Sequence, residues 1–385
     1  MKYLLIFLLL FRFAFAQSYK KLNEKAILAD THNDIISTCI EKGYHFDDDL
    51  TGKTHSDINR MKTGGVDVQV FSIWCDGKQP QPFAWANREI DTLYAWAVRN
   101  TSSMMIARTY GDVKKAVKQH KLAAMIGVEG GHMIENDMQK LDSLHKRGVC
   151  YMTLTWNNSN PWATSAMEET TDSLLHQPKG LSEKGKNIVR RMNELGMMVD
   201  LSHVGEQTFK DAIAVSSRPI LVSHSCVYNL CPVFRNLKDD QIKAVAQNGG
   251  VIQLNFFSGF LDSSFQTKYN AFLALHKNEI DSIKKTNPDQ LDSILNKKYT
   301  AEVEKIKAPF SLLFDHLDYI VKLVGVDYVG LGSDFDGISL PPQQLFDVTT
   351  YPLITKELMA RGYSKKEIRK ILGGNFLRVL KANAK

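Results

Sequence analysis

Six side chains that can bind a metal ion stand at the carboxyl ends of five predicted strands. They are three histidines and three carboxylates: His32, Asp34, Glu129, His203, His224 and Asp334. Taken alone, each would more often be a core histidine or a turn residue than a metal ligand. Six of them at five strand ends are not expected by chance. The set therefore predicts a metal site, a conclusion that depends on the strand assignment.

The residue types in this set suit two divalent cations held side by side. Two such ions about 3.5–4 Å apart bind a water between them and lower its pKa, so that hydroxide forms near neutral pH. Neutral imidazoles combined with carboxylates are typical ligands of zinc. His32 and Asp34 are alternate residues of an extended segment and point the same way, which places both on one ion. His203 and His224 are then predicted to hold the other ion.

Glu129 and Asp334 have separate predicted roles. A carboxylate has two oxygens, so Glu129, on a strand between the two halves of the site, can bridge the two ions. Asp334 is predicted to accept and pass on the proton of the attacking water. Simpler roles stay open for both residues, because Glu129 could bind backbone N–H groups of the glycines that follow it and Asp334 could belong to a turn.

The strands that must position these residues alternate with amphipathic helical stretches. Eight apolar, β-branched runs are each followed by a helical pattern, which predicts a (β/α)8 TIM-like barrel with its active site at the carboxyl ends of the strands. A doubly wound open sheet is disfavoured because no G-x-G-x-x-G turn follows the first strand. The predicted strands are residues 27–32, 66–74, 123–129, 149–156, 197–203, 219–224, 251–256 and 328–334.

The helical pattern also shows where the barrel is interrupted. A lysine- and aspartate-rich stretch, residues 261–310, has helical spacing and predicts a helical insertion between strands seven and eight, without a catalytic role. A last helix is predicted after Ser364, because Ser364 and Glu367 form a capping box. The other predicted helices are residues 83–100, 112–120, 138–147, 182–195, 206–215, 239–248, 311–324 and 353–361.

The amino-terminal residues 1–16 have the layout of a secretory signal peptide. Lys2 precedes an apolar run, and the sequence AFA at 14–16 precedes Gln17 as a small-residue cleavage site would. The run contains Arg12 and is too short to span a bilayer. We therefore expect a single barrel domain over 17–385, exported to the periplasm or secreted, with no stable membrane anchor.

Composition indicates a folded protein that does not bind nucleic acid. Of the 385 residues, 44% are hydrophobic and 23% charged, as in globular domains. The formal net charge of +6 is small for this length, and no block of lysine and arginine with interleaved aromatics occurs. Five cysteines leave at least one thiol free. Cys75 and Cys150 are predicted at opposite ends of barrel strands and cannot pair, whereas Cys39 could approach Cys75.

Nine short motifs run in order along nearly the whole chain. They are DTHND (30–34), VEGGH (128–132), TLTWNNSNPWA (153–163), VDLSH (199–203), SHS (223–225), FRN (234–236), DHLDYI (315–320), GSDFDG (332–337) and GGNFLRVL (373–380). In this order they resemble the membrane (renal) dipeptidase family, a branch of the amidohydrolase-like barrels.

The resemblance implies a binuclear zinc dipeptidase that hydrolyses free dipeptides, including those with a carboxyl-terminal D-residue. It implies two zinc ions per chain, Asp334 as the catalytic acid/base and Arg235 as the residue that holds the substrate carboxylate through parallel N–H groups. Without the family, Arg235 could equally be a surface arginine. A homodimer is left open. The implied zinc ligands are His32, Asp34, Glu129 (bridging), His203 and His224.

Trp156 departs from the family pattern. Strand four of relatives carries a histidine that helps to stabilise the developing oxyanion, and the sequence TLTW has Trp156 there. An indole N–H can donate one hydrogen bond but cannot be a cation. Trp156 is therefore predicted to bind substrate as a neutral donor, or else to pack in the pocket wall.

Two other functions remain open from the sequence. A barrel amidohydrolase that acts on cyclic amides or phosphoesters would carry a carboxylated lysine on strand four, and no lysine occurs there. A non-catalytic binding protein would keep the pocket without turnover, although all five predicted ligands are present.

Overall fold

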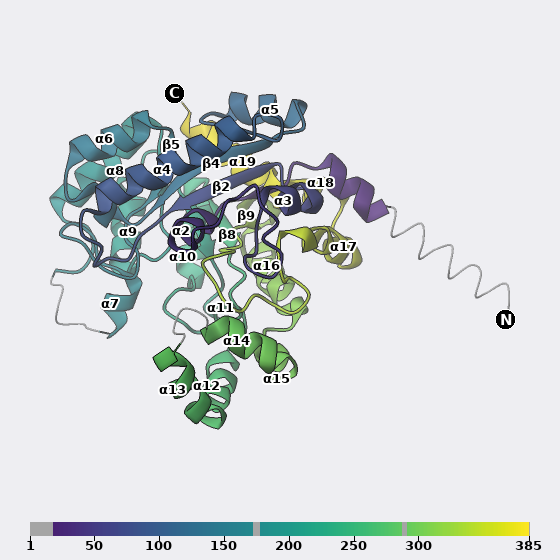
Figure 1. Cartoon of the computed structure of the whole chain (residues 1–385). Helices are drawn as coiled ribbons and strands as arrows, with labels where there is room; N and C mark the ends of the chain where they lie inside the picture. Colours follow the sequence, from purple (N-terminus) through teal and green to yellow (C-terminus); the bar gives the residue numbers. More distant parts are fainter. Residues whose placement is uncertain (1–17, 172–177, 287–290, 385) are drawn as a thin grey trace.

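The computed structural model describes residues 18–171, 178–286 and 291–384 (Figure 1). The predicted signal peptide, residues 1–16, lies outside the described residues. Part of the predicted insertion, residues 287–290, lies outside them too.

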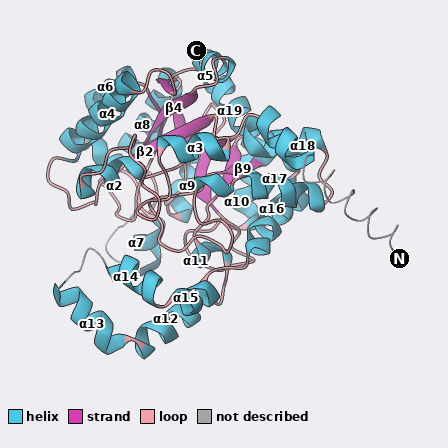
Figure 2. Ribbon diagram, turned by 45° about the vertical axis from the view of Figure 1, so that its right-hand side comes forward, coloured by secondary structure: helices cyan, strands magenta, loops and turns pink. Residues whose placement is uncertain are grey.

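In the described part of the chain, eight parallel strands close into a ring, which confirms the predicted (β/α)8 barrel. Each strand pairs with its neighbours in chain order, and the pairing of β2 with β4 completes the closure. Figure 2 shows the strands enclosed by helices. The ring consists of β1 (Ala29–Asp30), β2 (Val68–Ile73), β4 (Leu122–Glu129), β5 (Val149–Thr153), β6 (Met198–Asp200), β7 (Leu221–Ser225), β8 (Val251–Leu254) and β9 (Val329–Leu331).

A further short strand, β3 (Met104–Ile106), was not predicted. It pairs with the beginning of β4, at Leu122–Ala124, whereas β5 pairs with the end of β4 from Ile126 onward. Two strands thus share one edge of β4, and β3 is not needed to close the ring.

Several predicted strands were wrong at their carboxyl ends, where the chain leaves the sheet earlier. β5 ends at Thr153 instead of 156, β6 at Asp200 instead of 203 and β9 at Leu331 instead of 334. Beyond these ends the backbone keeps only single hydrogen bonds to the neighbouring strand, such as Leu201 N to Leu221 O at 2.9 Å, and side chains supply further partners. Asp200 Oδ1, for example, accepts from the N–H groups of Ser202 and Ser223 at 3.2 and 2.8 Å. Most of the predicted ligands therefore lie in loops that follow the strands.

Successive side chains of each strand point alternately to two buried faces, because helices cover the outside of the barrel and side chains fill its interior. Val68 and Val70 of β2 belong to one core cluster with Ala123 and Met125 of β4. Phe71, on the opposite face of β2, packs in the larger hydrophobic cluster beneath the helices. On β4 the inward face continues through Gly127 to Glu129, at the carboxyl end of the barrel.

The helices of the barrel agree with the predicted pattern, with additional short helices α2, α3 and α7 in the loops. The predicted capping box is present: Ser364 N donates to Glu367 Oε2 at 2.8 Å and Glu367 N to Ser364 Oγ at 3.3 Å. These helices are α2 (Ile35–Lys42), α3 (Ile58–Gly64), α4 (Pro82–Arg99), α5 (Tyr110–Lys118), α6 (Met138–Lys146), α7 (Ala166–Thr171), α8 (Glu183–Leu195), α9 (Glu206–Val215), α10 (Asp239–Asn248), α16 (Phe310–Val324), α17 (Pro352–Ala360), α18 (Lys365–Arg369) and α19 (Asn375–Asn383), with a π-helical turn at Lys370–Gly374.

Between β8 and α16 the chain forms a separate group of helices, green in Figure 1 and beside the barrel in both views. They are α11 (Ser258–Leu261), α12 (Phe265–Leu275), α13 (Lys277–Thr286), α14 (Leu291–Lys298) and α15 (Thr300–Ile306). Their apolar residues form their own small core. Phe257 joins this group to the barrel, because its ring contacts Phe260 and Phe265 at centroid distances of 5.0 and 5.2 Å.

The described helices include none that is long and apolar enough to cross a membrane. All five cysteines are buried with free thiols, so neither Cys39 nor Cys150 is joined to Cys75. Burial raises the pKa of the Cys39 and Cys75 thiols to about 12, which keeps both protonated at neutral pH.

Candidate metal centre and substrate pocket

Five of the predicted residues come from four places at the carboxyl end of the barrel. His32 and Asp34 lie between β1 and α2, and Asp34 is the N-cap of α2. Glu129 is the last residue of β4, His203 follows β6, and His224 is part of β7. The carboxyl ends of parallel strands meet at one face of a barrel, which brings these side chains together.

His203 and Asp334 have a backbone conformation that residues other than glycine rarely adopt. Their φ angles are +63° and +62°, in the left-handed region. Such a conformation costs free energy and is typical of functional sites, where the surrounding structure maintains it. In both cases the residue lies three positions beyond the end of its strand, and its side chain points toward the centre of the site.

Glu129 lies between two groups of ligands, and each of its oxygens faces one group. Oε1 is 2.8 Å from His203 Nε2 and 3.3 Å from His224 Nε2. Oε2 is 3.5 Å from His32 Nε2, which is itself 3.5 Å from Asp34 Oδ2. The Glu129 carboxylate therefore lies between two pairs of residues that were predicted to hold two separate ions. The pairs are His32 with Asp34 and His203 with His224.

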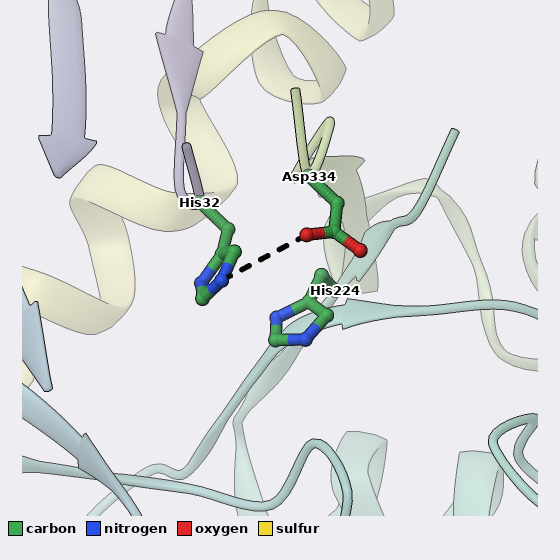
Figure 3. Close-up of side chains that lie close together, drawn as sticks. All are labelled: His32, His224 and Asp334. Atoms are coloured by element: carbon green, nitrogen blue, oxygen red, sulfur yellow. Dashed lines mark ion pairs between the residues drawn. The ribbon is translucent and has the colours of Figure 1, made fainter. Parts of the chain in front are cut away.

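Three overlapping clusters of donors result from this arrangement. In each, the ligand atoms lie within 4.8 Å of one another, a spacing that one cation could occupy. Figure 3 shows one of them: the side chains of His32, His224 and Asp334 converge from three strands, with Asp334 Oδ1 3.9 Å from His32 Nε2. The clusters are His32 with Asp34 and Glu129, Glu129 with His203 and His224, and His32 with His224 and Asp334.

The outer nitrogen of His32 is held by Tyr151. The Tyr151 hydroxyl donates to the backbone oxygen of Thr31 at 3.0 Å, so it accepts from His32 Nδ1, 2.9 Å away. His32 therefore carries its proton on Nδ1 and presents the Nε2 lone pair to the site. A side chain at Gly127 would overlap the Tyr151 ring, so this close approach requires glycine in β4.

The Nδ1 atoms of His203 and His224, which face away from the centre of the site, are also held by hydrogen bonds to side chains. His203 Nδ1 donates to Asn157 Oδ1 at 3.0 Å. His224 Nδ1 lies 2.8 Å from Ser223 Oγ, which donates to Asp200 Oδ2 at 2.6 Å and thus accepts from the imidazole. Partners of this kind fix the tautomer and the ring orientation of metal-binding histidines.

The ligand atoms that face the centre of the site lack hydrogen-bond partners, as is expected of a cation site. His32 Nε2 and Asp34 Oδ1 are buried without a hydrogen-bond partner among the described residues. With their protons on Nδ1, His203 and His224 face each other through Nε2 lone pairs only 2.9 Å apart. Buried unpaired acceptors are costly, and a shared cation would satisfy all of them. The residues present therefore fit a metal site.

The pKa values of these residues also favour a cation. Burial alone would lower the pKa of His32, but the Asp34 and Glu129 carboxylates outweigh it and raise this pKa to about 10. Burial would raise the pKa of Glu129, yet the positive charge of His32 holds it well below its usual range. Burial, helped by Arg235, lowers the pKa of His203 to about 4. His203 is thus a neutral imidazole, whereas His32 and the ionised Glu129 show that the carboxylates here stabilise a positive charge, which a metal ion would supply in place of the proton on His32.

Removal of the Tyr151 hydroxyl is expected to weaken metal binding without unfolding the protein. Tyr151→Phe leaves His32 free to change its tautomer and to rotate, and losses of this kind typically cost about 10–100-fold in metal affinity. Competition with a chromophoric chelator would measure the change. Tyr94→Phe is the matched control, because its hydroxyl bonds to Arg147 O at 2.9 Å, away from the site. Equal affinity for Tyr151→Phe and the wild type would contradict this role.

Arg235 is a buried guanidinium beside the metal centre. It is 4% exposed, and it donates to His224 O at 3.2 Å and to Ser225 Oγ at 3.4 Å, while its guanidinium lies 5.3 Å from the Phe260 ring centroid. No carboxylate of the described residues lies within 4.0 Å of it. Burial lowers its pKa, and an arginine still keeps its charge. A buried cation without an anion is suited to bind one from a ligand.

Asp334 is oriented by one hydrogen bond. Asn255, just after β8, donates through Nδ2 to Asp334 Oδ2 at 2.7 Å, which leaves Oδ1 directed toward His32. Burial raises the pKa of Asp334 above its usual value, against the opposing effect of His32. A carboxyl group with a raised pKa is better matched to proton transfer near neutral pH.

A cavity of about 420 Å³ connects these groups. Trp156, which follows β5, forms one wall and meets Trp74 edge to face, with ring centroids 5.2 Å apart. Phe257 and Phe260 line the side next to Arg235. The predicted site residues that line the cavity are Asp34, Glu129, Trp156, His203, Arg235 and Asp334, whereas His32 and His224 are fully buried behind it.

Sequence reasoning missed the uncharged residues that orient the ligands. Asn157 stands directly after the predicted strand 149–156, and Asn255 is a polar residue near the end of the predicted strand 251–256, so both positions were signals that could have been used. Tyr151 lies within an apolar strand, where an aromatic residue is ordinary, and nothing in the sequence marks it.

Comparison with known proteins identifies the group to which this barrel belongs. The sequence profile of the membrane dipeptidase family (peptidase family M19) matches residues 16–385. The chain belongs to this family. An uncharacterized dipeptidase of Schizosaccharomyces pombe is 32% identical over 386 residues, which cover 95% of this chain and 82% of the relative. The resemblance stated from the motifs is thus confirmed, and so is the assignment as a dipeptide-hydrolysing enzyme.

Solved structures of a probable dipeptidase and of a metallopeptidase share the fold. The probable dipeptidase PvdM from Pseudomonas aeruginosa superposes with a TM-score of 0.78 at 26% identity, covering 96% of this chain and 98% of that one. A metallopeptidase from Rhodobacter sphaeroides, solved with a phosphinate mimic of the dipeptide L-Ala-D-Ala, has a TM-score of 0.72 at 22% identity, covering 94% and 100%. These matches extend over the insertion as well as the barrel.

Proposed function

We propose that this dipeptidase works with two zinc ions and cleaves the peptide bond of free dipeptides. The observation that supports two ions is the position of Glu129, whose two oxygens face different groups of ligands. His32 and Asp34 would hold one ion, His203 and His224 the other, and Glu129 would bridge them. Histidine nitrogen with carboxylate oxygen is a donor set that suits zinc.

The chemistry that such a metal pair supplies is a bound water of lowered pKa and a polarised substrate carbonyl. Asp334, through Oδ1, would take up the proton of the attacking water and deliver it to the leaving amine. Asn255 keeps the other oxygen of Asp334 occupied, so one oxygen is directed to proton transfer. Trp156 would face the substrate across the cavity as a neutral donor.

Arg235 explains why the substrate should be a dipeptide. A free dipeptide carries its carboxylate one residue beyond the scissile bond, within reach of a guanidinium beside the metals. A longer peptide would place an amide there and leave the buried arginine without an anion. We include dipeptides with a carboxyl-terminal D-residue, a proposal supported by the dipeptide mimic in the Rhodobacter sphaeroides relative.

Turnover of small substrates tests this proposal. Zinc-loaded protein is expected to hydrolyse L-Ala-L-Ala and L-Ala-D-Ala, and chelator-treated protein to lose this activity until zinc is restored. A cyclic amide and a phosphotriester test the other barrel hydrolases, for which β5 lacks the lysine. Zinc binding without turnover of any of these compounds would favour a binding protein instead.

Trp156→His is expected to leave kcat for a dipeptide unchanged or to raise it. The substitution replaces a neutral donor by one that can carry charge, but the polarised carbonyl already has most of the stabilisation that it needs. Trp156→Phe, which keeps an aromatic ring without a donor, is the matched variant and should be slower than wild type. A kcat for Trp156→His below that of Trp156→Phe would contradict the assignment of Trp156 as an oxyanion donor.

We also propose that the chain is exported after cleavage before Gln17. The support is the order of Lys2, apolar run and AFA in residues 1–16. The intact mass of protein recovered from the producing cells should correspond to a chain that begins at Gln17. A soluble cytoplasmic form that retains residues 1–16 would contradict export. Light scattering would decide whether a homodimer forms.

A further inference from the structure

A second cavity adjoins the substrate pocket. It has a volume of about 350 Å³, and three residues line both cavities: His203, Phe234 and Arg235. Its other walls come largely from α9, from the beginning of α10 and from the segments that precede them. Arg235 therefore borders two spaces, one that contains the metal ligands and one that leads away from them.

Among the residues that the structure describes, cations outnumber anions in the walls of this second cavity. Among the described residues, one of the two acids, Glu206, already pairs with Lys238 Nζ. The other acid, Glu169, accepts a hydrogen bond from Thr164 Oγ1. Lys179 Nζ donates to the backbone oxygen of Glu169 at 3.1 Å. The four cations and two anions are Lys179, Lys210, Arg235 and Lys238 against Glu169 and Glu206.

Arg235 and Trp74, two residues that line the substrate pocket, lie on opposite sides of the barrel. Arg235 follows β7, whereas Trp74 follows β2, which stands across the ring from β7. With its carboxylate on Arg235, a dipeptide would direct its amino-terminal residue toward Trp74 and Trp156. The carboxyl-terminal residue stays at Arg235, and its side chain branches from the carbon atom next to the bound carboxylate. The second cavity is the space adjoining Arg235 that is not needed for the metals.

We propose that this second cavity is a subsite for the side chain of the carboxyl-terminal residue, and that it selects acidic side chains. This inference rests on the proposed dipeptidase function. A side-chain carboxylate of aspartate or glutamate would enter a space whose walls carry an excess of positive charge, with Lys210 and Lys179 near it. A basic side chain would be repelled by the same cations, so a dipeptide that carries one would bind more weakly.

Isosteric substrates isolate the charge from the size of the side chain. Ala-Glu and Ala-Gln have nearly the same shape, and Ala-Asp and Ala-Asn form a second such pair. We expect kcat/KM of the zinc-loaded full chain to be about five- to tenfold higher for the acidic member of each pair, mainly through KM. The ratio should fall as the NaCl concentration rises, because partly exposed charges are screened by salt.

Two lysine variants test whether the preference for acidic side chains arises in the second cavity. Lys210→Met and Lys179→Met should each move the ratio of Ala-Glu to Ala-Gln toward one. Lys243→Met is the matched control, because Lys243 is exposed on α10 and lines neither cavity, so the ratio should stay as in the wild type. Thermal unfolding of each variant would show that the fold is retained.

The outcomes separate this inference from the function on which it rests. Hydrolysis of Ala-Gln and Ala-Glu at equal kcat/KM would overturn the acidic subsite and leave the dipeptidase intact. A preference for Ala-Glu that persists in both lysine variants, or that Lys243→Met also removes, would overturn the location of the subsite. No hydrolysis of any of the four dipeptides would overturn both the subsite and the proposed function.

Discussion

Replacement of Glu129 by glutamine is expected to release at least one of two bound zinc ions and to remove most of the activity while the fold is retained. The amide keeps the shape of the side chain but loses the charge that can hold two cations. It also presents an N–H group either to His32 or to the pair His203 and His224, where acceptors already face inward. Because loss of an outer-shell partner alone costs about 10–100-fold, we expect a decrease in kcat/KM of more than about 100-fold.

Elemental analysis, dipeptide turnover and thermal unfolding would be measured together for this variant. Glu135→Gln is the matched control, since Glu135 lies in the same loop after β4 but is exposed and pairs with Lys140. The control should retain metal and activity. Two tightly held ions per chain in Glu129→Gln would refute the bridge.

Arg235→Ala is expected to remove the preference for dipeptides over tripeptides. Truncating one partner of a buried charge pair costs about 2–5 kcal/mol, which corresponds to at least about 30-fold in kcat/KM for a dipeptide. A tripeptide does not place its carboxylate there and should lose much less. Arg235→Lys keeps the charge without the two parallel N–H groups and should give an intermediate value.

The measurement is kcat/KM for Ala-Ala and Ala-Ala-Ala in the wild type and the variants. Arg190→Ala is the control, because this arginine is exposed on α8 and remote from the cavity. Equal turnover of both lengths by the wild type, or an unchanged ratio in Arg235→Ala, would show that the carboxylate does not bind at Arg235.

The barrel could be predicted from the sequence because its strands are buried on both faces and read as continuous apolar runs. The run at 123–129 corresponds to β4, observed at Leu122–Glu129 with every residue buried. β3 could not be predicted, since its three residues are too few for a periodic signal. Helix α2 was missed because it begins at Ile35, directly after polar site residues that conceal its pattern.

The candidate ligands could be predicted because histidines and carboxylates at strand ends are chemically distinctive. Their mutual geometry could not, because it depends on contacts between strands that are far apart in the sequence. Tyr151 illustrates the limit: it supports His32 only because Gly127, on the neighbouring strand, leaves room for its ring. Arg235 similarly could be recognised as a binding residue only from the structure, in which its guanidinium is buried without a carboxylate of the described residues beside it.

A crystal of the zinc-loaded protein, with anomalous diffraction measured on both sides of the zinc absorption edge, would show whether Glu129 bridges two zinc ions. We expect two zinc peaks, one on each side of the Glu129 carboxylate, the first beside His32 and Asp34 and the second beside His203 and His224. A single peak, or zinc bound without contact to Glu129, would contradict the bridge.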